Sequence, residues 1–381
     1  MGKLEIFCAG VSINILPCRP LNNILVNVPH EGGSIKAISD TLNMFQYAQC
    51  GHTYLDSGGF QIIVSELLGR HCTFDAAKSL HLSEWGVNIA PEHIVNVATA
   101  MQPEIVSALD FPIRKFTDKN DQEKEFLNKL GYNITWARKT ANLRRERCPH
   151  IKLMIPVQAY NLKQFGEFFH YIQDLDFDGL SLPVRNLEAY EITLFLIAFY
   201  KLNIRRVHIL GTSTLLTTAL AAFMAKHYFS WISLDSTSWR LSAQYNHYIN
   251  PFSLKSVDVS DNVVIDENIH INCQCPWCRG KTFTYIRNLP HTEKISFLRC
   301  HNWWVIEHAA KELYEHSDTV LTLKNHLLSR YPDTGAIEKL CNVLSIIDAM
   351  RDRSIDEIQS ACRIPFENIT TQFGGSHYEN K

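Results

Sequence analysis

Long apolar runs are absent from this chain of 381 residues, in which no stretch approaches the roughly 18 continuous apolar residues of a membrane span. The N-terminal residues 1–5 also lack the basic and then apolar pattern of a secretory signal. Neither a membrane-spanning nor a secreted protein is therefore expected. We predict a soluble, cytoplasmic protein.

Excess charge of one sign is absent too, because 37 Lys and Arg residues face 39 Asp and Glu residues and the formal net charge is -2. A strongly basic chain would attract nucleic acid over its whole surface, whereas this one would have to use local patches. The hydrophobic fraction of 46% and the charged fraction of 20% are typical of a globular, enzyme-like protein. The length suits one barrel with an appendage.

A disulfide framework is missing, although the chain has 11 cysteines. Their odd number and scattered positions indicate a reducing compartment. Three of them form the run Cys273-Gln274-Cys275-Pro276-Trp277-Cys278. Thiolates separated by one and two residues can converge on one ion, and a distant fourth ligand would complete the tetrahedron of a structural Zn²⁺ site. The run therefore predicts a metal site; three unrelated free thiols are the alternative.

Short apolar runs recur along the chain, and each is followed by a longer segment with helical periodicity. Being apolar on both faces, they are typical of parallel strands buried between layers. No glycine-rich dinucleotide fingerprint follows any of them, which favours a closed (β/α)₈ barrel over an open doubly wound sheet. The clearest runs are 54–57, 105–110, 153–158, 179–182, 207–211 and 231–235, with helical segments at 164–174, 187–201 and 213–227.

The fold class predicted is α/β, a (β/α)₈ TIM barrel with a small zinc-binding insert and a helical C-terminal region. We place the main part of the barrel in 1–252, the insert in 253–301, and a helical region that completes or flanks the barrel in 302–381. Within these parts the pattern predicts short strands at 254–259, 263–265 and 282–285, and helices at 303–313, 321–330 and 336–350.

Polar residues end several of the predicted strands: Asp56, Asp110, Gln158 and Asp235. In a (β/α)₈ barrel the chemistry lies at the C-terminal ends of the strands, so these side chains should meet in one pocket. The run 56–61, Asp-Ser-Gly-Gly-Phe-Gln, has two glycines that would let a flat ligand approach the backbone. A tight turn with an N-capping serine explains the same run equally well.

Two of these motifs carry a family resemblance. The run Leu55-Asp56-Ser57-Gly58-Gly59-Phe60-Gln61 resembles the signature of the tRNA-guanine transglycosylases, and the cysteine run with the later pair His301-Asn302 resembles the zinc site of that family. The resemblance covers roughly residues 54–302. It implies a (β/α)₈ barrel with a zinc insert, and the exchange of guanine in a nucleic acid for a 7-deazaguanine without ATP or a redox cofactor.

The resemblance also implies residue roles. Asp235 matches the nucleophile of the family, and Asp56 matches its general acid and base. The residues that match the base pocket are Ser57, Gly58, Gly59, Phe60, Gln61, Asp110, Gln158, Leu182, Leu210 and Gly211. One structural Zn²⁺ per chain would be held by Cys273, Cys275, Cys278 and His301, with Cys300 as the second choice for the fourth ligand.

The chain departs from the tRNA enzymes at two places. Their proline-threonine-arginine and glycine-arginine-glycine stretch after the nucleophile is replaced by Ser236-Thr237-Ser238-Trp239-Arg240, and their glycine-rich pocket wall by 179–183. Both departures resemble the DNA-guanine transglycosylases of bacterial and phage DNA-modification systems, which insert 7-cyano-7-deazaguanine. DNA and a 7-deazaguanine base are therefore the predicted partners, with tRNA as the alternative; a homodimer and helper proteins are compatible with this interpretation.

Nucleic acid needs basic groups for its phosphates and a stacking residue for a base that leaves the helix. The candidates are Trp239, Arg240, Arg279, Lys281 and Arg287. A non-catalytic, zinc-bearing nucleic-acid-binding subunit is the alternative from another class, and the presence of both Asp56 and Asp235 argues against it. A hydrolase that releases the base is a third interpretation, because water could cleave the same sugar ester.

Overall fold

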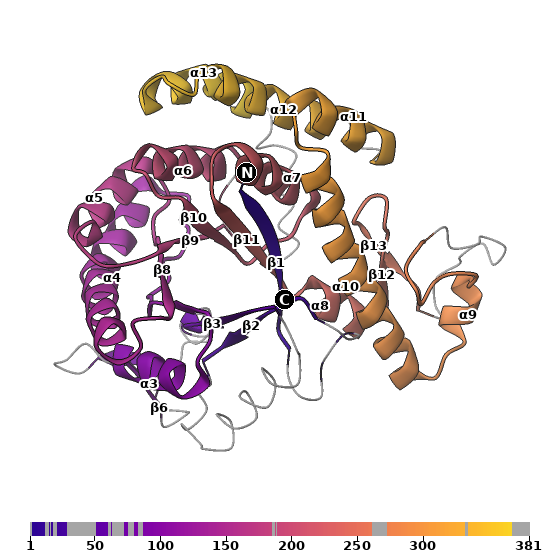
Figure 1. The fold of residues 1–381 in the computed structure, drawn as a ribbon, viewed down its shortest axis with the longest axis horizontal. Helices are drawn as coiled ribbons and strands as arrows, with labels where there is room; N and C mark the ends of the chain where they lie inside the picture. The colour runs from indigo at the N-terminus through magenta and orange to yellow at the C-terminus, as the bar shows by residue number, and fades with distance from the viewer. Residues whose placement is uncertain are drawn as a thin grey trace.

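Eight parallel strands close into a barrel in the computed structural model, in the order β1-β11-β10-β9-β8-β7-β3-β2 (Figure 1). They are β1 (Lys3–Ala9), β2 (Asn23–Asn27), β3 (His52–Asp56), β7 (Ile105–Ser107), β8 (Lys152–Pro156), β9 (Gly179–Pro183), β10 (Arg206–Leu210) and β11 (Trp231–Ser236). The structure describes residues 2–11, 15, 17, 21–28, 51–59, 62, 72–74, 80–82, 87–184, 187, 189–260, 273–331 and 334–367. The predicted barrel is confirmed, and β1 and β2 are the two strands that the sequence pattern missed.

Helices follow the strands and form the outer layer of the barrel. They are α3 (Pro91–Met101), α4 (Lys119–Arg147), α5 (Leu162–Ile172), α6 (Ala189–Lys201) and α7 (Leu215–His227). Several begin at a residue whose side chain satisfies a free backbone N–H of the first turn: Asp118 for α4, Asn161 for α5 and Thr214 for α7.

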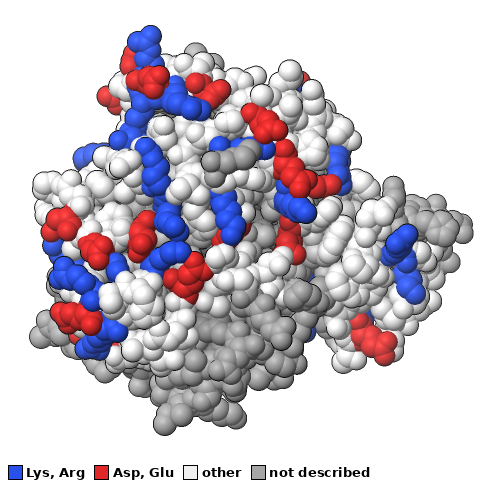
Figure 2. Space-filling model, in the orientation of Figure 1, with Lys and Arg blue, Asp and Glu red and all other residues white. Residues whose placement is uncertain are grey.

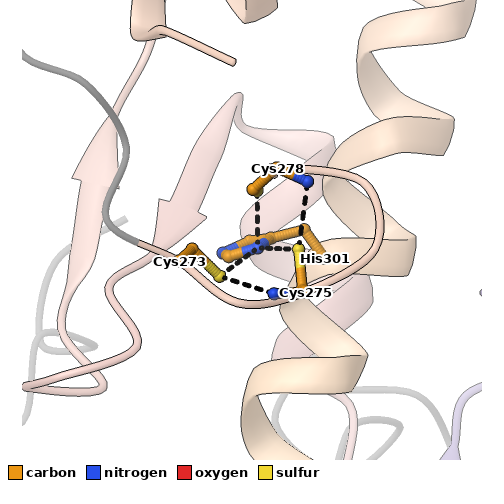
Figure 3. A group of neighbouring side chains, drawn as sticks. All are labelled: Cys273, Cys275, Cys278 and His301. Atoms are coloured by element: carbon orange, nitrogen blue, oxygen red, sulfur yellow. Dashed lines mark hydrogen bonds between the residues drawn. The ribbon is translucent and has the colours of Figure 1, made fainter. Parts of the chain in front are cut away.

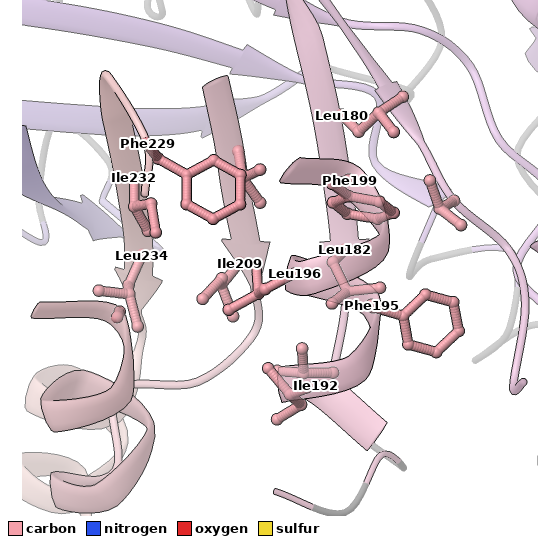
Figure 4. Close-up of a cluster of buried hydrophobic side chains, with 14 of the residues drawn as sticks. Leu180, Leu182, Ile192, Phe195, Leu196, Phe199, Ile209, Phe229, Ile232 and Leu234 are labelled. Atoms are coloured by element: carbon pink, nitrogen blue, oxygen red, sulfur yellow. The ribbon is translucent and has the colours of Figure 1, made fainter. Parts of the chain in front are cut away.

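The core lies between this helical layer and the outward faces of the strands. Figure 4 shows Phe195 and Phe199 of α6 beside Leu180 and Leu182 of β9, and these side chains are almost completely buried. Each large apolar side chain buried in this way contributes roughly 1.5–3 kcal/mol to folding. A separate buried cluster, which includes Phe7, Tyr54, Met154 and Trp231, fills the barrel interior on the opposite faces of the strands, so the site lies above it at the strand ends.

The chain after β11 contains the cysteine run and then returns to the barrel. It forms α8 (Ser238–Gln244), the antiparallel pair β12 (His247–Ile249) and β13 (Ser256–Asp258), the short helix α9 (Phe283–Arg287) and the long helix α10 (His291–Glu315). Helix α10 packs against β1, α7 and α8, so it covers the barrel where β11 meets β1.

Three further helices lie outside the barrel helices (Figure 1). They are α11 (Val320–Arg330), α12 (Thr334–Ala349) and α13 (Ile355–Glu367), and they contact α6 and α7. A small antiparallel sheet of β4 (Cys72–Phe74), β5 (Leu80–Leu82) and β6 (Val87–Ile89) is inserted between β3 and α3. Within the described residues, no helix is long and apolar enough to cross a membrane.

Local predictions after β11 were partly wrong. The strand expected at 282–285 is the start of α9, because the Thr282 side chain accepts a hydrogen bond from the Tyr285 N–H and caps a helical turn. The strand expected at 254–259 is confirmed only over β13, and 263–265 lies outside the described residues. The helices expected at 303–313, 321–330 and 336–350 are confirmed, whereas α10 begins at His291 and continues unbroken through 301. The three-part division of the chain stays a prediction.

Candidate active site and metal centre

Three carboxyl groups come together at the C-terminal ends of the barrel strands. Asp56 is the last residue of β3, Asp110 follows β7, and Asp235 lies in β11. Burial raises the pKa of Asp56, and the nearby charge of Asp235 raises it further. The two carboxyl groups therefore interact electrostatically in one site, as the strand pattern predicted.

Asp110 is fixed by two hydrogen bonds. The Ser57 hydroxyl donates to its Oδ1 at 2.7 Å, and Nε2 of Gln158 donates to its Oδ2 at 2.6 Å. Burial and then the charge of Asp56 raise the pKa of Asp110 to about 7, although both hydrogen bonds act in the opposite direction. Gln158, which follows β8, is oriented in turn because its Oε1 accepts a hydrogen bond from the Ile113 N–H at 3.2 Å.

The glycines after β3 have a structural explanation. A Cβ atom on Gly59 would lie 2.5 Å from Oδ1 of Asp110, so only glycine fits there without displacing the carboxyl group. The N–H of Gly58 donates to Oδ2 of Asp56 at 3.2 Å. The contact of Gly59 with Asp110 joins the run that begins at Asp56, at the end of β3, to the end of β7. The predicted Phe60 and Gln61 lie outside the described residues.

Asp235 is held by its neighbouring strand. Its Oδ1 accepts a hydrogen bond from the Gly211 N–H at 2.7 Å, and Gly211 has a φ of 85°, which favours glycine. Gly211 therefore lies beside Asp235, and the base-binding role of Leu210 and Gly211 stays a prediction. Leu182 does not lie beside Asp235, because its side chain points outward and packs against α6 (Figure 4). Only the backbone of Leu182 could face a ligand in the barrel mouth.

His208 of β10 belongs to this site, and the sequence interpretation missed it. It is completely buried, and its Nε2 lies 3.6 Å from Oδ1 of Asp235. The signal was present in the sequence, because His208 is the one titratable residue in the otherwise apolar run 207–211. A polar residue at an inward position of a barrel strand is unusual, since aliphatic side chains normally fill the barrel.

The cysteine run and His301 form the second cluster (Figure 3). The sulfur atoms of Cys273, Cys275 and Cys278 and the Nδ1 atom of His301 all lie within 4.8 Å of one another, and all four residues are buried. His301 Nε2 lies 2.8 Å from the Ile249 carbonyl, which accepts its proton and leaves the Nδ1 lone pair facing the sulfurs. Three thiols and one imidazole in this arrangement are a donor set that fits a tetrahedral ion such as Zn²⁺.

Surrounding groups hold these side chains in place. Tyr248 stacks on the His301 ring with centroids 3.8 Å apart, and the Cys278 N–H donates to Cys275 Sγ at 3.2 Å. The neighbouring Asn302 accepts a hydrogen bond from the Ile249 N–H at 2.8 Å, which fixes the strand that supports His301. Cys300, the second choice, is partly exposed and outside the cluster. Consecutive helical residues point about 100° apart, so α10 can direct only one of Cys300 and His301 at the sulfurs.

The structure places the five residues predicted to contact nucleic acid in different surroundings. Trp239 is completely buried and its Nε1 donates to the Ala9 carbonyl at 3.0 Å, so its ring is not exposed for stacking on a base. The Arg240 guanidinium donates to the Gly10 carbonyl at 3.0 Å, and Lys281 lies 4.0 Å from the centre of the Tyr285 ring. Arg279 is exposed and Arg287 is half-buried, and for both the role stays a prediction. On the face shown in Figure 2, basic and acidic side chains are intermixed without a broad basic region.

The fold and the two clusters define a class: a (β/α)₈-barrel protein with a carboxyl site at the strand ends and an appended Cys₃His cluster that could hold a metal ion. The family model "Queuine tRNA-ribosyltransferase" matches residues 26–332, so the chain belongs to this family of pentosyltransferases.

Similar curated proteins carry the name tRNA-guanine(15) transglycosylase. The Pyrococcus abyssi protein is 32% identical over 103 residues, which are 27% of this chain and 15% of the relative. The Sulfolobus acidocaldarius protein is 23% identical over 230 residues, 58% of this chain and 43% of the relative. The Thermococcus kodakarensis protein is 28% identical over 131 residues, 34% of this chain and 20% of the relative. The chain thus spans less than half the length of these relatives.

Proposed function

We propose that this protein exchanges guanine in DNA for 7-cyano-7-deazaguanine through a covalent Asp235 intermediate. The observation that carries the proposal is the electrostatic contact between Asp56 and Asp235 at the strand ends of a barrel from a pentosyltransferase family. Two carboxyl groups with different surroundings can divide the nucleophilic and the proton-transfer roles.

In the first step, one oxygen of Asp235 attacks C1′ of the target nucleoside while the bond from C1′ to N9 breaks. The bonding electrons leave with guanine, and Asp56 in its acid form donates the proton that neutralises them. The raised pKa of Asp56 suits this role, because the carboxyl group keeps its proton to a higher pH than an exposed aspartate. The products are an Asp235 sugar ester, free guanine and the Asp56 carboxylate.

In the second step, the deazaguanine occupies the place of guanine and loses its N9 proton to the Asp56 carboxylate. N9 then attacks C1′ and the ester bond to Asp235 breaks, which restores both carboxyl groups to their starting forms. Two inversions at C1′ give net retention. No proton, electron or other reactant is left over.

The base would be read by Asp110, with Ser57 and Gln158 beside it. These three polar groups are already hydrogen-bonded to one another, so their positions are set before a ligand arrives. Gly59, which has no side chain, allows the Asp110 carboxyl group to lie close against the backbone after β3. A purine edge with adjacent donors and acceptors is the kind of ligand that this set suits.

The proposed metal is one structural Zn²⁺ at Cys273, Cys275, Cys278 and His301. When bound, the ion would cross-link the insert, and four protein ligands would leave it no open position for substrate. The residues themselves orient the site through the His301 bond to Ile249 and the Tyr248 stack. The chemistry proposed for Asp56 and Asp235 does not involve the metal.

The segment after the proposed nucleophile supports DNA over tRNA. It turns directly into α8, where Trp239 is packed in the core, and Arg240 is the one cation between 236 and 244. The tRNA enzymes that the chain resembles have several arginines and glycines in that place. The second candidate, exchange in tRNA, is favoured by the family description and by the names of the relatives.

A labelled-base assay tests the proposal. Purified protein would be incubated with labelled guanine or 7-cyano-7-deazaguanine and with either duplex DNA or tRNA of defined sequence. Incorporation into DNA is expected, whereas incorporation into tRNA alone would replace the DNA proposal with the tRNA one. Release of guanine without incorporation would indicate a hydrolase, and tight DNA binding without either reaction would indicate a non-catalytic subunit.

A further inference from the structure

A buried histidine lies directly behind the proposed nucleophile. His208 is completely buried, its Nδ1 lies 2.6 Å from the Ser233 hydroxyl, and its Nε2 lies 3.6 Å from Oδ1 of Asp235. Nε2 makes no hydrogen bond to any described residue. A buried polar atom that lacks a partner is rare and calls for an explanation, and here Asp235 is the polar group that it faces.

The surroundings of His208 keep its ring in this orientation. The Tyr54 ring lies against it with centroids 4.6 Å apart, and the Phe7 ring meets it in a T-shaped arrangement with centroids 6.0 Å apart. Tyr54 is itself held by hydrogen bonds to the Ser107 and Ser181 hydroxyls at 3.1 Å and 3.0 Å. Aromatic packing on both sides therefore prevents the imidazole from turning away from Asp235.

The Asp235 carboxylate favours the tautomer with the proton on Nε2, and the Ser233 hydroxyl, which can donate or accept, is then free to donate to Nδ1. When the hydroxyl donates to Nδ1, the proton of neutral imidazole is on Nε2 and points at Asp235. The 3.6 Å separation is longer than a hydrogen bond, and catalytic contacts of this kind commonly tighten when the substrate binds. The opposite tautomer would place a lone pair of Nε2 against the carboxylate, which is unfavourable.

We propose that His208 is a positioning residue for Asp235. The Gly211 N–H and the His208 Nε2–H would both hold Oδ1, so Oδ2 is the oxygen directed at C1′. Ser233 supports His208 from the other side of the ring, through its hydrogen bond to Nδ1. This inference rests on the proposed role of Asp235 as nucleophile.

Three variants test the proposal against a matched control. His208→Phe keeps a ring but removes the donor, His208→Gln keeps a neutral N–H near the position of Nε2, and Ser233→Ala removes the hydroxyl that bonds to Nδ1. Ser317→Ala is the control, because Ser317 is also a completely buried serine but bonds to the Leu313 carbonyl of α10, away from His208.

The readout is the rate at which saturating DNA forms a denaturation-resistant adduct in a single turnover, corrected for the folded fraction. We expect His208→Phe to slow this step about 10- to 100-fold with KM nearly unchanged, since a misplaced reacting group costs roughly this much. His208→Gln should recover most of the rate, Ser233→Ala should be intermediate, and Ser317→Ala should match the unmodified protein. A wild-type adduct rate in His208→Phe, or equal losses in His208→Phe and Ser317→Ala, would overturn the proposal.

A second measurement does not depend on activity. Nitrogen NMR of ¹⁵N-histidine-labelled protein, with His208 assigned from the His208→Gln spectrum, reports which ring nitrogen is protonated. A proton on Nε2 that shifts in Asp235→Asn supports the positioning role, and a proton on Nδ1 would contradict it. If the unmodified protein forms no adduct while this signal is as expected, the proposed reaction fails and the contact between His208 and Asp235 stands.

Discussion

The two ends of the barrel treat their carboxyl groups in opposite ways. At the N-terminal end, Glu104 pairs with Lys152 at 2.6 Å and with His52, and these contacts lower its pKa although burial alone would raise it. At the C-terminal end, Asp56 and Asp110 have no cationic side chain bonded to them among the described residues, and burial raises both pKa values. The N-terminal end pairs its carboxyl group with cations, which stabilises the fold. The C-terminal end places carboxyl groups close together without a bonded cation, which suits chemistry.

The largest expected effect is at the C-terminal end. Asp235→Ala should reduce base exchange by roughly 10⁴-fold or more and abolish the covalent adduct, because the attacking oxygen is gone. Stability should change little or rise, since a buried charge is removed. Adduct formation on denaturing gels and thermal unfolding check both points, and adduct formation at the normal rate by Asp235→Ala would move the nucleophile elsewhere.

The metal centre sharpens the comparison, because it should behave as a purely structural site. Cys275→Ala should lose bound zinc and more than about 4 kcal/mol of unfolding free energy, since an incomplete buried metal site is among the most destabilising of single changes. Metal content and urea unfolding measure this effect. Cys300→Ala is the control, because Cys300 neighbours His301 but lies outside the cluster. A stable, metal-loaded Cys275→Ala protein would contradict the assigned ligand set.

The stability of the protein should depend on pH in opposite directions at the two ends of the barrel. The folded pKa of Asp110 is about 7 and its unfolded value is near 4, so between these values the folded state holds more protons and stability falls as pH rises through 7. Asp110→Asn should lack this loss and should also weaken base binding. Urea unfolding from pH 5 to pH 8 tests it. If the unfolding free energies of the two proteins changed in the same way with pH, Asp110 would not have a raised pKa.

The smallest effect is expected at the N-terminal end. Glu104→Gln should cost about 1 kcal/mol or less, because the pairs with His52 and Lys152 are partly exposed. The pKa of Glu104 is lowered, so its contribution is present at neutral pH and disappears as the pH falls through that value. Unfolding curves at pH 7 and pH 4 check the direction, and base exchange should stay unchanged. A tenfold loss of exchange would remove the distinction between the two ends.

The sequence predicted the parts of this molecule that follow simple periodicity or spacing. Six barrel strands were recognised because each is a buried apolar run, and Asp56, Asp110 and Asp235 were expected together because the ends of parallel strands converge. Strands β1 and β2 were missed, since Lys3 and Glu5 interrupt the apolar run of β1 and the apolar part of β2 is only three residues long, 24–26. The contact of His208 with Asp235 depends on side-chain direction within the closed barrel, which no local pattern contains.

The sequence alone could not determine which way individual side chains point. Helix α10 points His301 rather than Cys300 at the sulfurs, and its rotation is set by packing on β1 and α7. Trp239 was a candidate for stacking on a base, yet its indole N–H donates to the Ala9 carbonyl inside the fold. In both cases a contact with a strand more than two hundred residues away in the chain decides the outcome.

Helix α10 links the cysteine cluster to the closure of the barrel. It supplies His301 to the cysteine cluster and, over the same continuous length, covers the seam between the first and last strands of the barrel. Opening the insert would therefore loosen the closure of the barrel. The two regions should behave as one cooperative unit, in which amide protons of β1 and of the insert exchange with solvent at a common rate.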